Sequence, residues 1–187
     1  MKNNFLHISL FFFFTFLTAA SCKKPGSSNP VDQLPPETQT GANTFGCLID
    51  GEVFLPKGNP LAGPVKKAQY QFVGGKQGFG VSASQKQNDG SIKLVGIGGD
   101  SISLSVNTFD LTKSNTAGKY YGGYSEISFS STGNDFSTND INRGQLVIKK
   151  FDTVNQIVSG TFWFDAKNAS GQIVHITEGR FDMPYVR

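Results

Sequence analysis

Phe45–Pro56 read FGCLIDGEVFLP, and this stretch predicts a β-hairpin. Asp50 and Gly51 stand between two apolar runs, and such a pair favours the two-residue turn of antiparallel strands because both positions tolerate positive φ. In that register Cys47 lies opposite Phe54. We therefore expect Cys47 to be a small buried hydrophobic residue rather than a reactive thiol.

The next pair along the hairpin is also apolar, because Leu48 lies opposite Val53 in the same register. Successive strand residues face opposite sides of a sheet. Both faces of the hairpin are therefore apolar, and we expect both to be covered by other parts of the fold.

Outward from the hairpin, alternating apolar and polar residues recur through Phe45–Arg187, with Gly, Asn and Asp at the breaks. No window shows the i, i+3, i+4, i+7 apolar spacing of an amphipathic helix. Pro56–Lys67 is expected to be a loop because it holds three prolines. The strands predicted after it are Tyr70–Gly74, Gly78–Gln85, Ser91–Gly98, Ile102–Phe109, Ser125–Ser131, Gly144–Asp152, Ile157–Ala166 and Gln172–Asp182.

Residues 45–187 have the length of one domain. The connections between the predicted strands are short, which favours antiparallel neighbours. We therefore predict an all-β fold, a single antiparallel meander of about 9–11 strands that closes as a sandwich or as a curled, barrel-like sheet. The last three strands are the longest and are expected to carry the core.

Two stretches, TFGCLIDGEVFLP at residues 44–56 and GTFWFDAKNASGQIVHITEGRFD at residues 160–182, resemble an uncharacterised domain family of Gram-negative cell-envelope lipoproteins. In that family a hairpin opens the domain, and a Gly-x-Phe-x-Phe strand, a turn and a Gly-x-Phe strand close it. The resemblance covers the two ends of the domain. It implies an envelope lipoprotein of β architecture and carries over no catalytic residue.

Ahead of the domain, residues 22–44 are expected to be a flexible tether that begins at Cys22. Its only large apolar residues are Val31 and Leu34, and four prolines lie among Ser, Asn, Gln, Thr and Gly. Such a segment cannot bury enough apolar surface to offset the entropy lost on ordering.

Residues 1–21 have the order of a secretory signal peptide, with Lys2 near the start, an apolar run over Phe5–Leu17 and small residues before Cys22. The apolar run is shorter than the roughly 20 residues of a membrane-spanning helix. Ala-Ala-Ser-Cys resembles the lipobox of bacterial lipoproteins, in which the cysteine sulfur receives a diacylglycerol and becomes the N-terminus. An ordinary secretory leader, an N-terminal membrane anchor and a Cys22–Cys47 disulfide are the alternatives.

Lys23 directly after the cysteine resembles signals that send lipoproteins to the outer membrane, so we expect the domain to face the periplasm from that membrane. The formal net charge of +3 comes entirely from Lys2, Lys23 and Lys24, and the rest of the chain carries 14 basic and 14 acidic residues. This balance gives no electrostatic footprint for nucleic acid.

Catalytic chemistry has little support in the sequence. His175 is the only histidine that remains once the leader is removed, and we expect it to be a half-buried strand residue with one hydrogen bond. The segment Ser131–Gly144 is predicted to be a loop rich in oxygen ligands, which makes Asp135 and Asp140 a candidate calcium site. Its spacing differs from that of the EF-hand, and Asx residues commonly form turns. We predict no catalytic residue, metal or cofactor.

Aromatic residues supply the remaining candidates for binding, because an exposed ring beside glycines can stack on a sugar ring or pack against a partner protein. The alternative is that they fill the core or edge of the sheet. The candidates are Tyr120, Tyr121, Tyr124 and Trp163.

Taken together, these features predict a non-enzymatic lipoprotein of the cell envelope, anchored to the membrane through its N-terminal lipid, with a β-domain that binds an envelope protein or a glycan or has a structural role. The alternative is a carrier that holds a small apolar ligand inside a barrel. An enclosed cavity of about 300 Å³ or more favours the carrier, and a filled core favours the interaction domain.

Overall fold

A computed structural model describes residues 29–187 except 59–63, 74, 114–115 and 129–130. Strands dominate, and no helix in this part of the chain is long and apolar enough to cross a membrane. The elements are the 3-10 helix η2 (Pro30–Gln33) and the strands β1 (Thr44–Ile49), β2 (Glu52–Phe54), β3 (Lys66–Val73), β4 (Lys76–Lys86), β5 (Ile92–Asp100), β6 (Thr108–Leu111), β7 (Lys119–Ser128), β8 (Ser131–Ser137), β9 (Gly144–Asp152), β10 (Ile157–Lys167) and β11 (Ile173–Pro184).

The strands form one 11-stranded sheet in the order β2-β1-β11-β10-β9-β6-β7-β5-β4-β3, with β8 paired to β7 and β10. All pairs are antiparallel except β6 with β7. The predicted all-β, mainly antiparallel fold is therefore confirmed. Its meander is interrupted where β6 inserts between β9 and β7.

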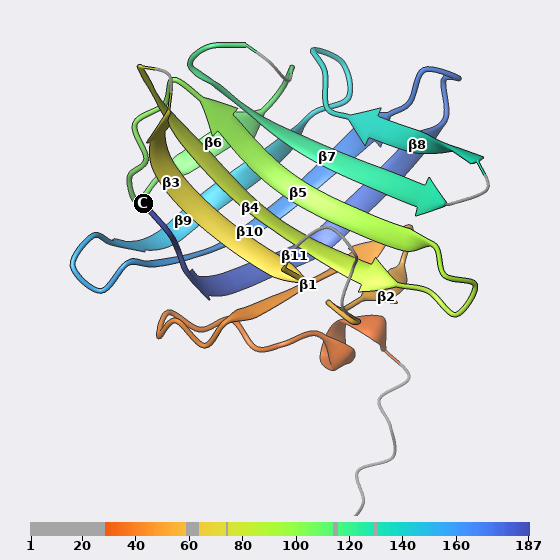
Figure 1. The fold of residues 1–187 in the computed structure, drawn as a ribbon, viewed down its shortest axis with the longest axis horizontal. Helices are drawn as coiled ribbons and strands as arrows, with labels where there is room; N and C mark the ends of the chain where they lie inside the picture. The colour runs from red at the N-terminus through yellow and green to blue at the C-terminus, as the bar shows by residue number, and fades with distance from the viewer. Residues whose placement is uncertain (1–28, 59–63, 74, 114–115, 129–130) are drawn as a thin grey trace, which may run out of the picture.

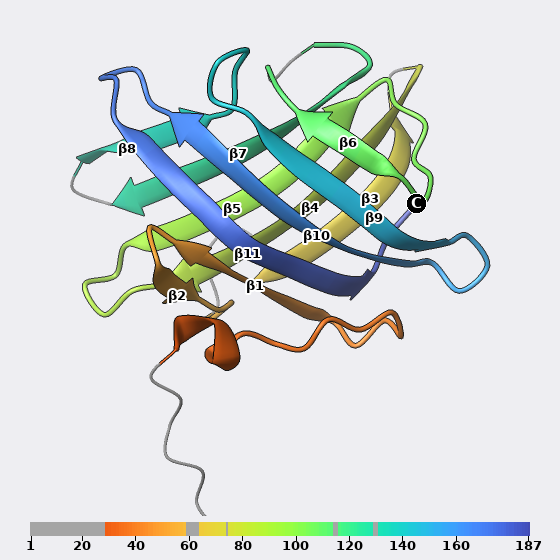
Figure 2. The same ribbon diagram turned by 180° about the vertical axis from the view of Figure 1, so that it is seen from behind.

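The sheet curls into a partial ring, which agrees with the barrel-like form of the prediction. β3, β4, β5 and β7 form one wall, and β9, β10 and β11 form the opposite wall (Figures 1 and 2). Just beyond β11, the Val186 amide donates to the Ala68 carbonyl at 3.1 Å and the Val186 carbonyl accepts from the Tyr70 amide at 2.9 Å. These bonds join the end of β11 to the otherwise distant edge strand β3.

Apolar side chains from both walls fill the interior as one contiguous cluster. Phe162 lies 5.5 Å from Phe45 and 6.2 Å from Phe164, measured between ring centroids. Gly122 on the facing strand makes room for this packing, because a Cβ there would lie only 2.6 Å from the Phe164 ring. Such interdigitated apolar packing is typical of a protein core.

The opening hairpin forms as predicted. Cys47 pairs with Phe54, and the turn residues Asp50 and Gly51 both have positive φ, at 50° and 86°. Cys47 has no exposed surface and is a free cysteine, so burial raises the pKa of its thiol.

The outer face of the hairpin is covered by a segment that was expected to be tether. Leu34 is buried, and a Cβ on Gly46 of β1 would lie 2.7 Å from the Pro35 ring. We call residues 34–43, which lie along the lower edge of the sheet in Figure 2, the strap. The prediction of a flexible tether up to Thr44 is therefore wrong for residues 29–43.

A buried carboxylate explains why so polar a segment is ordered. Asp182 of β11 is 1% exposed and accepts hydrogen bonds from the Thr38 hydroxyl at 2.6 Å and from three strap amides, those of Thr40 at 2.9 Å, Gly41 at 2.8 Å and Ala42 at 3.1 Å. Burial alone would raise the pKa of Asp182, but these bonds outweigh it and hold the pKa below its ordinary value.

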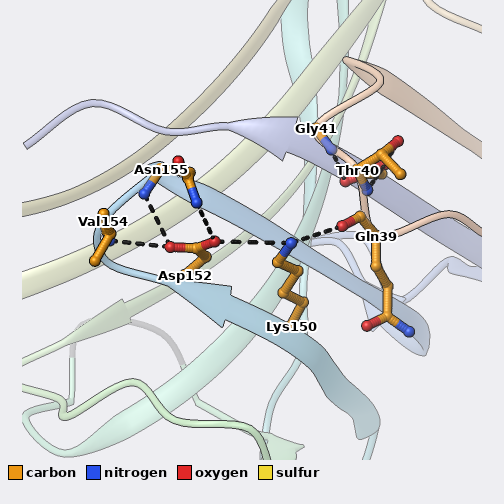
Figure 3. Close-up of polar contacts among 8 residues, drawn as sticks. Gln39, Thr40, Gly41, Lys150, Asp152, Val154 and Asn155 are labelled. Carbon is orange, nitrogen blue, oxygen red and sulfur yellow. Dashed lines mark hydrogen bonds and ion pairs between the residues drawn. The ribbon is translucent and has the colours of Figure 1, made fainter.

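Lysine side chains of β9 hold the strap from a second direction. The Lys150 ammonium donates to the Gln39 carbonyl at 2.9 Å and lies 3.7 Å from the Asp152 carboxylate (Figure 3). Lys149 forms an ion pair with Glu37. The strap is thus joined to the sheet by charged contacts and hydrogen bonds, with Leu34 and Pro35 as apolar contacts.

Several strand positions predicted from the sequence differ from the structure. β7 begins at Lys119, ahead of the predicted strand Ser125–Ser131, and β3 begins at Lys66, inside the predicted loop Pro56–Lys67. Ser131–Ser137, expected to be loop, forms β8, and residues 102–107 of the predicted strand Ile102–Phe109 form no strand. Ile102 and Leu104 are nevertheless buried, so their alternation with exposed neighbours comes from side-chain packing without strand pairing.

Candidate functional site

The four aromatic candidates do not share one face of the sheet, because successive residues of a strand point to opposite faces. Tyr120 and Tyr124 point into the core and are buried, which agrees with the alternative that these rings fill the core of the sheet. Burial, with a smaller effect from Tyr70, raises the pKa of Tyr120 to about 12. Tyr121 points outward and covers Gly98, where a Cβ would lie 2.6 Å from the phenol ring.

Trp163 is the candidate that remains available to solvent. It lies on the outer face of β10 with 47% of its surface exposed, and it pairs with Gln145 of β9. The next outward residue of β10 is Thr161, which pairs with Val147 on one side and Arg180 on the other. Two rows of outward side chains thus cross three strands, about 7 Å apart along the strand direction.

A β-bulge in β11 lies opposite Trp163. The register shifts between Phe162 and Phe164, so Thr177 and Glu178 together face the single residue Trp163. Glu178 has φ 54°, a left-handed conformation that costs a non-glycine residue about 1–3 kcal/mol. The bulge exposes both residues, where a regular strand would bury one of them.

These residues line an open groove of about 390 Å³ on the outer face of β9, β10 and β11. Figure 2 shows these strands in front, with the strap below them. The strap contributes one wall of the groove through Glu37. The full lining is Glu37, Gln145, Val147, Thr161, Phe162, Trp163, Thr177, Glu178, Gly179 and Arg180.

Charges around the groove are paired within the protein. The Arg180 guanidinium lies 3.0 Å from the Glu178 carboxylate and also donates to the Glu178 carbonyl at 3.2 Å. Glu37 is paired with Lys149. The groove, which we call the Trp163 groove, therefore combines a half-exposed indole with a nearly neutral polar lining.

Three polar side chains of the Trp163 groove have unused hydrogen-bonding capacity. In the described part of the chain, the structure shows no hydrogen bond to the side chains of Gln145, Thr161 or Thr177. The amide offers two donors and an acceptor, and each hydroxyl offers one donor and acceptor sites. The sequence singled out Trp163 alone. The signal for its neighbours was the outward position of each on its strand, together with the Thr-Glu-Gly bulge.

His175 lies on the same outer face, one row beyond Trp163. It is exposed rather than half-buried, because it points outward from β11. Its Nδ1 lies 2.7 Å from an Asp165 oxygen. The hydrogen bond to Asp165 raises the pKa of His175 and outweighs the opposing effect of burial. Among the described residues, no hydroxyl or thiol is hydrogen-bonded to Nε2.

A second open groove, of about 350 Å³, lies on the opposite wall. It is lined by Tyr121 and by outward glycines of β4, β5 and β7, including Gly80, Gly96 and Gly98. The polar side chains of Lys67, Gln69, Ser82 and Ser125 also line it. Its aromatic ring packs over Gly98 and is less exposed than that of Trp163, which makes this groove the weaker candidate for stacking on a ligand.

The remaining predicted site residues are dispersed. Asp135 pairs with Ser125 in the β7–β8 ladder, and Asp140 lies in the turn between β8 and β9. That turn is closed by the Asn139 carboxamide oxygen, which accepts from the amides of Ile141 and Asn142. In the described ranges, no group of three or more His, Cys, Asp or Glu side chains could hold a metal ion. Cys22 lies outside the described residues.

Comparison with known proteins places the chain in a family without assigning it an activity. No curated protein and no solved structure matches the chain. A family model matches residues 80–183, which cover more than half of the chain and all of the Trp163 groove except the strap wall. The chain therefore belongs to the family described as Domain of unknown function (DUF6252).

Proposed function

We propose that this protein is a lipid-anchored lipoprotein of the cell envelope whose β-domain is a non-enzymatic binding module. The support for the anchor is the order of the leader, with a basic start, an apolar run too short to span a bilayer and the Ala-Ala-Ser-Cys sequence ending at Cys22. Lys23 supports a position at the outer membrane, facing the periplasm.

The observation that carries the binding role is the contrast between the interior and the outer face. The interior is filled by a contiguous apolar cluster, whereas the Trp163 groove presents an exposed indole beside uncommitted polar side chains. A carrier of small apolar ligands needs interior volume, so this contrast favours recognition at the surface.

The ordered strap shortens the connection to the proposed anchor. Only residues 23–28 separate Cys22 from Asn29, where the described part of the chain begins. Six residues can span at most roughly 20 Å. A lipid on Cys22 would therefore hold the domain close to the bilayer, so the binding partner must be present near the membrane surface.

Cell fractionation with a matched pair of cysteine variants tests the anchor. Three acyl chains, each contributing about 0.8 kcal/mol per buried methylene, hold a protein firmly in a bilayer. The wild type and Cys47→Ser are expected in the membrane pellet and to incorporate labelled palmitate. Cys22→Ser is expected in the soluble fraction or as an unprocessed precursor, without the label. Equal labelling of both cysteine variants would contradict the proposal.

A further inference from the structure

We propose that the Trp163 groove binds a neutral glycan, with a sugar ring stacked on the Trp163 indole. This inference rests on the proposed binding role and names the chemistry of the ligand. It does not depend on the lipid anchor.

The stacking surface is the first element of the argument. Trp163 is the sole tryptophan of the chain and is 47% exposed. It points away from the core because it alternates along β10 with the inward residues Phe162 and Phe164. A large flat ring held by flanking strands is a rigid contact surface that loses little conformational entropy on binding.

The bulge is the second element, and it is independent of the tryptophan. Holding Glu178 at φ 54° has an energetic cost. The bulge places Thr177, Glu178 and Arg180 in the groove beside Trp163. Strained backbone of this kind persists only where the surrounding structure holds it, and it is concentrated at ligand sites.

The hydrogen-bonding groups select the class of ligand. A sugar ring presents an apolar face of C–H groups and a rim of hydroxyls that both donate and accept. The indole matches the face, and the free groups of Gln145, Thr161 and Thr177 match the rim. A lipid tail would leave these polar groups unpaired, which is unfavourable.

The ion pairs of the groove disfavour charged ligands, both cationic and anionic. The two acidic residues of the groove are paired with Arg180 and Lys149, so neither a cationic nor an anionic ligand finds an unpaired partner. An anionic polysaccharide would have to compete with Glu178 for the guanidinium, whose side chain is only 14% exposed. The groove is complementary to an uncharged ligand.

The sole tryptophan gives a direct readout of the site. We would titrate the full-length chain, purified in detergent, with cellohexaose and chitohexaose as neutral probes and with polygalacturonate as the charged control. At least one neutral probe is expected to shift the Trp163 emission and to protect it from acrylamide quenching. The response is expected to be unchanged between about 50 mM and about 500 mM salt, because no ion pair forms on binding.

Variants separate this groove from other exposed aromatic surface. In calorimetric titrations, Trp163→Ala is expected to weaken binding by about tenfold or more, which corresponds to about 1.4 kcal/mol. Thr177→Val keeps the size of the side chain and is expected to weaken binding by a smaller factor. Phe72→Ala removes an aromatic ring that is 72% exposed on β3 and is expected to leave binding unchanged.

The proposal is overturned if neither neutral probe changes the Trp163 emission, if Trp163→Ala binds as tightly as the wild type, or if polygalacturonate is preferred. Cross-linking of an envelope protein to the groove, without any glycan response, would also overturn it in favour of a protein partner. Fractionation of Cys22→Ser measures only membrane attachment, whereas the titrations measure only glycan binding. The two experiments therefore show separately whether the proposed lipid anchor or the proposed glycan site is wrong.

Discussion

His175 shows how one hydrogen bond sets the charge of an exposed residue. Its Nδ1 lies 2.7 Å from Asp165 across the β10–β11 ladder, and this bond raises the pKa of the imidazole. The pair therefore stabilises the fold fully below the ordinary pKa of histidine, about 6.5, and the contribution is lost as pH rises through the higher folded pKa. Both side chains are exposed, so the contribution is small.

We expect an NMR titration to place the His175 midpoint above about 6.5. Asp165→Asn is expected to lower that midpoint, because the charged partner is lost. Asp140→Asn removes an exposed carboxylate in the β8–β9 turn and serves as the control. A His175 midpoint that Asp165→Asn leaves in place would show that the hydrogen bond is not formed in solution.

Single residues were predictable where a pattern fixed their direction. Cys47 follows from the hairpin register, which sets both its partner and its burial. The direction of the tyrosines in β7 was not predictable, because three rings within five residues fit either alternation. No strand was predicted at residues 119–124, and only the observed burial of Tyr120 and Tyr124 on β7 assigns these rings to the core and leaves Tyr121 outside.

At the scale of the element, the β1–β2 turn depends on left-handed backbone at Gly51. Its φ is 86°, and a Cβ there would meet no atom within 4 Å, so a substitution acts through backbone strain alone. Gly51→Val is expected to lower the free energy of unfolding by more than about 1 kcal/mol, measured by urea denaturation. Gly51→Asn should cost less, because asparagine tolerates positive φ. Equal midpoints for wild type and Gly51→Val would show that the turn is misassigned.

The strap depends on the charge of Asp182. Because hydrogen bonds hold the folded pKa of this carboxyl below its ordinary value, its contribution to stability is present above about pH 4 and is lost as pH falls through the folded pKa. Asp182→Asn is expected to destabilise the protein at pH 7 by roughly 2 kcal/mol or more, because amide groups of the strap lose a charged acceptor. It should also expose residues 34–43 to proteolysis.

Asp135→Asn is the matched control for the strap prediction, because Asp135 is an exposed carboxylate on β8. It is expected to leave stability and the cleavage pattern unchanged. If Asp182→Asn unfolds in urea like the wild type and shows the same loss of stability in acid, the strap is not held by the Asp182 carboxylate.

A strand was predictable from the sequence where apolar and polar residues alternate between recognisable turns. Gly144–Asp152 was predicted with its observed bounds because apolar and polar residues alternate between clear turns. β8 was missed because Phe136 is its only large apolar residue, so its sequence lacks the alternation of a strand, although it pairs with β7, the strand just before it in the chain. The strap was missed for a different reason, since its order depends on Asp182, more than 130 residues away.

On the scale of the whole molecule, the sequence predicted an all-β fold but could not choose between a sandwich and a barrel. That choice depends on the last residues of the chain, where Val186 bonds to β3 across the gap. The groove was predictable only through Trp163. Its other residues come from three strands and the strap, and the fold alone brings them together.

The lipid that we propose on Cys22 would hold the β-domain at a membrane and leave its outer face available to a partner. Mass spectrometry of the N-terminal peptide of the protein extracted from membranes tests this most directly. We expect a mature chain that begins at Cys22 and carries a diacylglyceryl group with an amide-linked acyl chain. A chain that keeps its leader, begins elsewhere, or carries an unmodified Cys22 would contradict it.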